Sequence, residues 1–497
     1  MQNGIYLPNG MEAIQAHYTE LPLEEFNQNP LIQALPPLAN KQTIIRKLMV
    51  KPIYKEEDKY AENVYRLHMV NRLYQLFQPL PKHVDVWNMI HSLIVQGYMA
   101  RNPFDKKYKQ YINETGNEII NRSFDINSRR NFRTTAGCGT FLGFSGMGKT
   151  TTINRILSNI PQVIIHNEYK GKHFNQIQLV WLKLEAPSNS SLKALCLQFF
   201  MKIDEILGTN NYKKYVSRNM SVDNMLPLIS QVAHNIGLGL LVIDEIQHIK
   251  RRGADQIMNF FVSLINTGVN VALIGTPGAY RLFGEELRIT RRLTGNSEII
   301  YNNMGFGSEF KFLLESIWNY QWTQKFVPYN EEFAKVIYQE TLGISDLMVK
   351  LIVFSQQTAI ETGKEELTIE LIRKVAKEKF RLMKPMLDAI RSGNPHKIAK
   401  YEDIGRIDLE QATIPTNKPI ISSESKKIKR VKSNDKVEVN EKVESPSKKA
   451  KYSKEYMEDD LRFLLQEGVK SEKSPYEVLL ESEYIEDIEK WIRVNVI

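Results

Sequence analysis

One octapeptide limits the folds open to this chain more than any other feature. Residues 143–150 read Gly-Phe-Ser-Gly-Met-Gly-Lys-Thr, which matches the phosphate-loop pattern G-x-x-x-x-G-K-[ST]. An apolar lead-in, residues 139–142, precedes the loop, and a helical pattern begins at Thr151. Because the pattern needs a strand, a turn and a helix in that order, it predicts an α/β fold with a parallel sheet.

The loop also predicts a ligand. Its glycines allow successive backbone N–H groups to point at phosphate oxygens, and the following helix presents its positive end. Lys149 adds a mobile positive charge, and Thr150 offers a hydroxyl to a magnesium ion. The sequence therefore predicts ATP or GTP as a ligand, with Mg²⁺. The residues expected to hold the nucleotide are Gly143, Ser145, Gly146, Met147, Gly148, Lys149, Thr150 and Thr151.

A second strand candidate ends in two acids. Residues 239–243 form a continuous apolar run that is followed by Asp244 and Glu245. Such a run is typical of a buried parallel strand, and the carboxyl ends of these strands are where open α/β sheets bind ligands. We expect Asp244 to reach the magnesium ion, directly or through water, and Glu245 to polarise the water that attacks the γ-phosphate. Two carboxylates at this place suggest hydrolysis.

Further catalytic candidates follow. A third strand candidate, residues 269–275, ends at Thr276, whose hydroxyl could bond the γ-phosphate or the attacking water, although it could equally open an ordinary turn. Arg288, Arg291 and Arg292 could place a guanidinium at the ATP of a neighbouring subunit, or they could be plain surface charge.

An ordered series of short motifs extends beyond the nucleotide residues. The motifs are residues 29–37 (NPLIQALPP), 97–98 (GY) with 101–103 (RNP), 186–193 (APSNSSLK), 242–248 (VIDEIQH), 259–262 (NFFV), 274–276 (IGT), 291–292 (RR), 318–322 (WNYQW) and 343–346 (GISD). From residue 29 to 390 the chain resembles the TnsC branch of the TnsC/TniB transposition regulators, which are AAA+ ATPases. One departure is that residues 343–351 offer Lys350 where AAA+ proteins often carry a second sensor arginine.

The resemblance implies an ATP-dependent assembly on double-stranded DNA, as a homo-oligomeric ring or filament. It also implies contact with a target-selecting protein through the N-terminal region, and recruitment of a transposase. Two other functions stay open: a helicase loader or origin remodeller on the same fold, and an ATP-gated adaptor that barely hydrolyses.

Composition indicates an intracellular protein in several parts. The chain has 497 residues, of which 42% are apolar and 25% charged, and only two cysteines. No apolar run approaches the roughly 20 residues that a membrane helix needs, so we expect a cytoplasmic protein without membrane contact.

The expected organisation follows the resemblance and the changes in composition. It comprises a mostly helical N-terminal region (1–133), an AAA+ core (134–302), an α-helical lid (303–391), a basic disordered linker (392–454) and an acidic tail (455–497). In the lid, Thr368 precedes an apolar helical pattern as an N-cap residue would. The tail combines acids with apolar clusters, which is typical of a segment that docks on a partner, here the transposase, although it could also pack on the body.

Charge points to a polyanion. Residues 422–454 hold eleven Lys/Arg and five Asp/Glu, a charge of +6, and residues 455–497 hold five Lys/Arg and twelve Asp/Glu, a charge of −7. Because the whole chain carries +9, the rest of the chain carries +10. A basic body suits DNA, although many proteins with such a surplus never bind it. The predicted phosphate contacts lie in loops that flank a strand at 178–184, namely Lys170, Lys172, Ser190, Ser191 and Lys193. The alternative is that Lys170, Lys172 and Lys193 are merely solvated.

Contacts to phosphates without base readout make a testable prediction. Affinity should be similar for unrelated DNA duplexes and should fall steeply as salt rises, because each neutralised phosphate releases counterions. Fluorescence anisotropy on several duplexes over a salt series measures both properties. A strong preference for one short base sequence would contradict the prediction.

Overall fold

We describe a computed structural model of the chain over residues 4–120, 134–216, 221–250, 254–282, 297–398 and 401. Internal contacts divide the chain into Met1–Pro415 and Thr416–Ile497, and every described residue belongs to the first unit. Arg288, Arg291 and Arg292 lie outside the described residues, as do the tail at 455–497 and nearly all of the linker at 392–454. These assignments therefore stay predictions.

Five parallel strands form the central sheet. They are β3 (Cys138–Gly143), β6 (Trp181–Glu185), β7 (Leu240–Asp244), β8 (Asn270–Gly275) and β9 (Ser297–Tyr301), in the order β6-β7-β8-β3-β9. Every residue of β3, β7 and β8 is buried, as expected for strands that are covered on both faces. The predicted α/β fold with a parallel sheet is confirmed.

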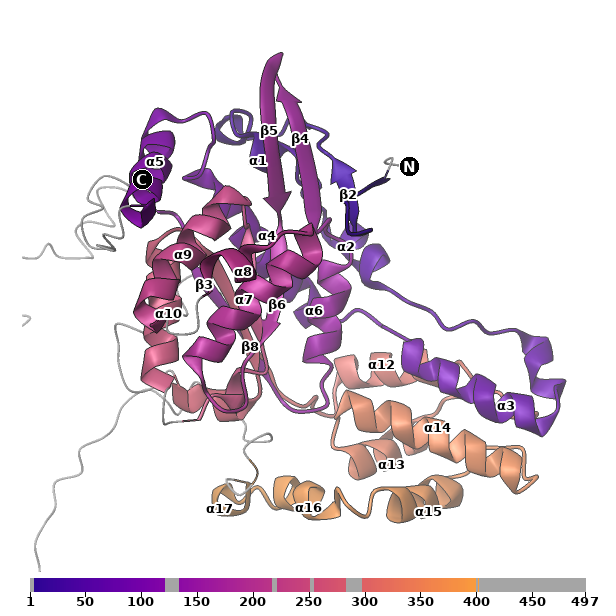
Figure 1. Ribbon diagram of the computed structural model, residues 1–497. Helices are drawn as coiled ribbons and strands as arrows, with labels where there is room; N and C mark the ends of the chain where they lie inside the picture. The colour runs from indigo at the N-terminus through magenta and orange to yellow at the C-terminus, as the bar shows by residue number, and fades with distance from the viewer. Residues whose placement is uncertain are drawn as a thin grey trace, which may run out of the picture. The chain divides into compact units, whose positions relative to one another are not determined.

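Alternate side chains of these strands enter two hydrophobic cores. Val242 of β7 packs in the core that includes Ile90 and Ile153, whereas its neighbour Ile243 packs in the core that includes Phe200. The helices on the two faces are α4 (Pro81–Met99), α6 (Lys149–Leu157), α7 (Leu192–Leu207), α8 (Asn211–Tyr215), α9 (Val222–Asn235) and α10 (Ala254–Asn266) (Figure 1). The sheet thus lies between helical layers.

A second sheet, which the sequence did not predict, contains the first strands of the chain. Its strands are β1 (Gly4–Tyr6), β2 (Glu12–Gln15), β4 (Val163–Tyr169) and β5 (Lys172–Leu179), in the order β1-β2-β4-β5. β4 and β5 form an antiparallel hairpin, whose turn residues Lys170 and Gly171 have φ of 49° and 75°. The sequence gives no local signal for β1 and β2, because these strands are short and β2 pairs with a segment about 150 residues later.

The prediction of a single strand at 178–184 is wrong, because two strands, β5 and β6, share this stretch. The chain changes partner at Val180: Leu179 still pairs with Val163 in the second sheet, and Trp181 already pairs with Leu240 in the central sheet. Both backbone groups of Val180 are bonded, since its N–H donates to the Gln162 carbonyl and its carbonyl accepts from the Leu240 N–H. A continuous extended segment gives no local signal for such a change, so only the pairing reveals two strands.

The remaining helices belong to the ends of the described chain. Near the N-terminus these are α1 (Pro30–Gln33), α2 (Lys41–Leu48), α3 (Asn63–Val70) and α5 (Lys106–Ile120); the lid contains α12 (Ser308–Trp318), α13 (Glu331–Thr341), α14 (Ser345–Glu361), α15 (Ile369–Lys379), α16 (Lys384–Ser392) and α17 (Pro395–Ile398). The Thr368 hydroxyl accepts the Leu371 N–H at 3.2 Å and caps α15. No helix of the described residues is both long and apolar enough to cross a membrane.

Gly97, Tyr98 and Arg101, which contribute to the resemblance, tie α4 to the start of β7. The Tyr98 hydroxyl donates to the Gly237 carbonyl at 2.7 Å, and the Arg101 guanidinium donates to the Leu238 carbonyl at 2.8 Å. Gly97 lies so close to Asn270 that a Cβ there would stand 1.7 Å from its side-chain amide nitrogen. Tyr98 and Arg101 therefore hold α4 at the start of β7, Gly97 allows its close approach to the start of β8, and all three residues have a structural role.

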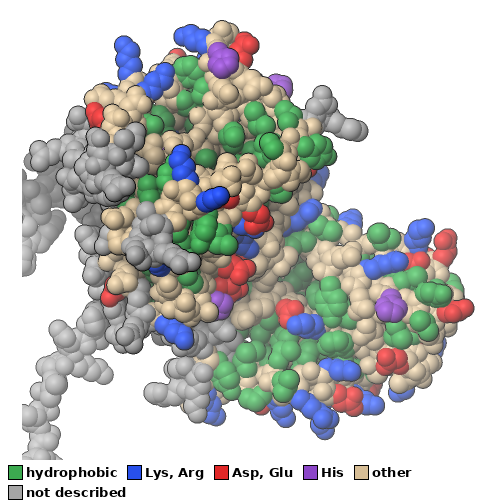
Figure 2. All heavy atoms as spheres, in the orientation of Figure 1, with side chains coloured by type: hydrophobic (Ala, Val, Ile, Leu, Met, Phe, Trp, Pro, Cys, Tyr) green, Lys and Arg blue, Asp and Glu red, His purple; other side chains and the backbone are tan. Residues whose placement is uncertain are grey.

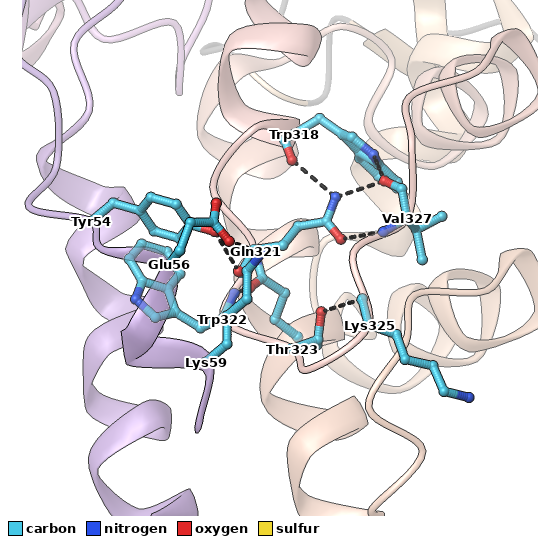
Figure 3. Close-up of polar contacts among 10 residues, drawn as sticks. Tyr54, Glu56, Lys59, Trp318, Gln321, Trp322, Thr323, Lys325 and Val327 are labelled. Atoms are coloured by element: carbon cyan, nitrogen blue, oxygen red, sulfur yellow. Dashed lines mark hydrogen bonds and ion pairs between the residues drawn. The ribbon is translucent and has the colours of Figure 1, made fainter. Parts of the chain in front are cut away.

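Residues 51–76, here called the strap, leave the core and dock on the lid. Val50 and Phe77 close the base of the strap by exchanging two backbone hydrogen bonds. In the strap, Tyr54 donates to the Gln321 carbonyl at 3.1 Å and meets the buried Trp322 ring edge-on, 5.2 Å between centroids (Figure 3). Helix α3 of the strap packs along α14 of the lid (Figure 1).

A buried ion pair reinforces this docking. Arg66 of α3 donates two parallel hydrogen bonds to the Glu365 carboxylate, each 2.7 Å long, and a third to the Trp322 carbonyl at 3.2 Å. The side chain of Arg66 is 1% exposed and that of Glu365 is 13% exposed. The bidentate geometry matches a planar guanidinium to a planar carboxylate and fixes the strap in one register.

We expect Arg66→Met to lower the free energy of unfolding by about 3 kcal/mol, because it leaves the Glu365 carboxylate poorly solvated and unpaired. Chemical denaturation followed by tryptophan fluorescence measures this change. The double variant Arg66→Met/Glu365→Gln should recover part of the loss, since the orphaned charge is gone. If both variants unfolded with the same free energy as the wild type, the Arg66–Glu365 pair would not be what holds the strap on the lid.

Candidate nucleotide-binding site

The phosphate loop joins β3 to α6 with two glycines in the left-handed region. Gly146 has φ of 80° and Gly148 has φ of 79°, values that favour glycine strongly. Gly148 is also the N-cap of α6, so the first amides of that helix face the loop. The predicted strand, turn and helix are all present.

A cavity of about 670 Å³ opens over this loop. Of the predicted nucleotide ligands, all but Gly143 line it: Ser145, Gly146, Met147, Gly148, Lys149, Thr150 and Thr151. Gly143 instead packs on β9, where a Cβ would stand 2.6 Å from the Tyr301 carbonyl oxygen. The size is in the range of small-molecule sites, and the exposed amides of the loop make a cradle suited to phosphates.

Lys149 extends back across the loop. Its ammonium donates to the Phe144 carbonyl at 3.0 Å, and the residue is 9% exposed. This position keeps a positive charge at the concave side of the loop, where phosphate oxygens would take over the role of the carbonyl. The residues fit a triphosphate.

Glu245 and Thr276 meet at the same cavity through a residue that the sequence analysis missed. Gln247, in the short 3-10 turn η5 (Ile246–His248), donates its amide to the Glu245 carboxylate and accepts the Thr276 N–H at 3.0 Å. All three residues line the cavity. Glu245 has φ of 58°, an uncommon value for a residue with a side chain, which directs the carboxylate to this place.

Asp244 takes a more withdrawn position. It is 2% exposed and is not among the cavity's lining residues; one carboxylate oxygen accepts the Glu245 N–H at 2.9 Å, and the other lies 2.9 Å from the ammonium of Lys183. The described residues contain no group of three or more His, Cys, Asp or Glu able to hold a metal by themselves. A magnesium ion here would therefore rely on nucleotide phosphates with Thr150 and Asp244, which is the usual way this ion binds beside phosphates.

The apolar part of the cavity comes from two distant segments. Leu73, Phe77 and His83 approach from the N-terminal side, and Leu313 and Ile317 approach from α12 of the lid. Burial lowers the pKa of His83 to about 4, so its imidazole is neutral at neutral pH, and it accepts the Leu80 N–H at 3.0 Å. Such a wall suits a nucleotide base. No local pattern marks it, because its two halves lie more than 200 residues apart.

The lid touches the phosphate loop directly. The carbonyl of Gly146 accepts both the Ser345 hydroxyl at 2.9 Å and the Asp346 N–H at 3.0 Å, from the first turn of α14. Asp346 lines the cavity, whereas Lys350 does not; the Lys350 ammonium is paired with the Asp346 carboxylate at 2.6 Å. Lys350, which stands where AAA+ proteins often carry a second sensor arginine, is thus paired with an acid of its own helix.

The predicted DNA contacts fall into two separate groups. Lys170 and Lys172 lie at the tip of the β4–β5 hairpin, and Ser190, Ser191 and Lys193 follow the far end of β6 (Figure 1). Lys170 donates to the Asn27 carbonyl, Ser190 accepts the Lys250 N–H, and Ser191 caps α7, so these side chains have partners within the protein.

Basic side chains also gather elsewhere. Figure 2 shows Lys and Arg along the lower edge of the lid, over α15 and α16. The exposed cations of this stretch are Arg373, Lys374, Lys377, Lys379, Arg381, Lys384 and Arg391. The basic surplus is therefore not confined to the predicted loops.

Comparison with known families decides the class of this domain. Residues 131–283 match the family described as "AAA domain". This segment is similar to AAA domains in sequence. It accounts for the phosphate loop, for the acids after β7 and for Thr276 after β8, all of which lie within its bounds.

Solved structures give fold-level similarities only. The Aeropyrum pernix ORC1 protein in complex with DNA is 12% identical, with a TM-score of 0.35, over 61% of this chain and 79% of that chain. The Walker-type ATPase paby2304 of Pyrococcus abyssi is 13% identical, with a TM-score of 0.33, over 59% and 77%. Domain III of the Thermotoga maritima replication initiation protein DnaA is 11% identical, with a TM-score of 0.28, over 55% and 92%. Comparison with curated proteins gives no match.

The bridge through Gln247 makes a prediction. In Gln247→Ala the Glu245 carboxylate loses its donor and the Thr276 N–H loses its acceptor, so we expect ATP turnover to fall by about tenfold or more, in the range of a misplaced general base, with nucleotide affinity changed less than about twofold. Steady-state phosphate release and binding of a fluorescent nucleotide measure the two quantities. His248→Ala, which also borders the cavity, is the matched control and should keep most of the turnover. A large loss of affinity in Gln247→Ala would assign the residue to binding instead.

Proposed function

We propose that this protein is an ATP-dependent regulator of transposition, similar in role to the TnsC proteins. It assembles on double-stranded DNA, links a target-selecting protein to a transposase, and is reset by ATP hydrolysis. The observation that carries the proposal is the cavity where the phosphate loop, the Glu245–Gln247–Thr276 group and the first turn of α14 meet. Support for the transposition role comes from the motif series between residues 29 and 390.

In this proposal each residue at the cavity has one task. The loop amides and Lys149 bind the triphosphate, and Glu245 orients the attacking water and accepts its proton. Gln247 holds Glu245 and the Thr276 backbone in place, so that the Thr276 hydroxyl can bond the γ-phosphate. Thr150 and Asp244 would hold a magnesium ion, which would supply charge neutralisation at the phosphates. A neighbouring subunit contributes Arg288, Arg291 or Arg292 as a further positive charge.

The lid contact explains how chemistry becomes a signal. Since Ser345 and Asp346 bond the same loop carbonyl that borders the phosphates, the position of α14 depends on what the loop holds. Arg66 of α3 ties the strap to the lid, and the end of the strap and the residues just after it line the base side of the cavity. A ligand that favours one lid position shifts the population of the whole strap and lid. The N-terminal region, which we assign to the target selector, is thereby coupled to the nucleotide.

DNA and the transposase complete the proposal. Sequence-neutral phosphate contacts from Lys170, Lys172, Ser190, Ser191 and Lys193 would position a homo-oligomeric ring or filament on the duplex. The acidic tail at residues 455–497 would dock on the transposase. A helicase loader would share the ATPase site but not this tail partner, and an adaptor would share the partner but not the need for turnover.

The substitution Glu245→Gln tests the switch. It removes the base while keeping the shape, so we expect turnover to fall by about a hundredfold or more and the DNA-bound assembly to persist after ATP is diluted. Phosphate release and the dissociation rate from DNA measure the two effects. Glu185→Gln is the control, because Glu185 ends the neighbouring strand β6, is exposed and does not border the cavity. If transposition proceeds and resets normally with Glu245→Gln, the adaptor function replaces the switch.

A further inference from the structure

Lys183 occupies a position that neither the sequence patterns nor the proposed mechanism uses. It projects from β6, one strand away from the acids, and its ammonium lies 2.9 Å from an Asp244 carboxylate oxygen and 2.8 Å from the Asn154 side-chain oxygen. The side chains of Lys183 and Asp244 are 19% and 3% exposed. This is a largely buried ion pair at the predicted metal ligand.

The second partner places the ammonium near the other predicted ligand as well. Asn154 and Thr150 are four residues apart on α6, so they share one face of that helix with about 5–6 Å between their Cβ atoms. Lys183 therefore connects the helix that carries Thr150 with the strand that carries Asp244. The second Asp244 oxygen is already engaged by the Glu245 N–H. A metal ion that takes Asp244 as a ligand has to share the carboxylate with this ammonium.

We propose that Lys183 is the resident counter-ion of Asp244, neutralising it when no metal is present and competing with magnesium when metal arrives. The inference rests on the proposed nucleotide site. A carboxylate on a side chain that is 3% exposed is costly to leave unpaired, and its negative charge would repel an incoming triphosphate. The ammonium removes that repulsion, but it also repels a divalent cation at the same place.

Two opposite effects on nucleotide affinity follow. Without magnesium, Lys183 helps ATP to bind, because it cancels a nearby negative charge. With magnesium, Lys183 weakens binding, because the metal has to approach a carboxylate that is already paired. The quantity that isolates the role is the ratio of the dissociation constant without magnesium to that with magnesium. A purely structural lysine would change both constants alike and leave the ratio unaltered.

The experiment measures binding of a non-hydrolysable ATP analogue to the full chain, in chelator and in millimolar magnesium. Lys183→Gln should raise the ratio by on the order of tenfold, since a unit charge within a few Å of the site is removed. Lys183→Arg keeps the charge and should keep the ratio near that of the wild type. Asn154→Ala removes the neutral partner only and should change the ratio less than about twofold.

Asn154→Asp provides a second test in case Lys183→Gln does not fold. Position 154 is exposed, so the substitution leaves the core intact, and its new carboxylate draws the ammonium away from Asp244. We expect the ratio to rise in the same direction, by about threefold. If Lys183→Gln folds and its ratio stays unchanged or falls, the counter-ion role is overturned. If Lys183→Gln does not fold, an unchanged ratio in Asn154→Asp overturns that role instead. Absence of nucleotide binding by the wild type under both conditions would instead refute the proposed function itself.

Discussion

The parallel direction of the five central strands is the constraint on which the site depends. Because all five run the same way, the carboxyl ends of β3, β7 and β8 meet at one edge, and each end delivers a different group. β3 delivers the phosphate loop, β7 delivers Asp244 and Glu245, and β8 delivers Thr276. A single side chain, that of Gln247, then joins the last two ends.

Closure of the cavity depends on segments from outside the AAA domain. The base side is lined by the end of the strap, by residues that follow it and by α12 of the lid, and the phosphate side is bonded to α14. The strap itself is held on the lid by Arg66 and Glu365, which are 299 residues apart in sequence. Binding chemistry and attachment of the N-terminal region thus share one set of lid helices, which is what an energetically coupled device requires.

What could be predicted from the sequence was local. The octapeptide at 143–150 and the apolar run before Asp244 each carry their meaning within about ten residues, and the parallel sheet follows from such runs alone. The bridge by Gln247, the apolar wall with His83, and the exchange of sheets at Val180 depend on pairing over long distances. The strands β1 and β2 belong to the same class, since three or four residues hold too little pattern to distinguish a strand from a loop.

Val180 has one more consequence. The hairpin of β4 and β5 is joined to β6 by this single buried residue, and both of its backbone groups are hydrogen-bonded. The hairpin therefore continues without a loop into the strand that pairs with β7 beside Asp244. The exposed hairpin tip and Lys183 thus lie on one unbroken length of extended chain that belongs to both sheets.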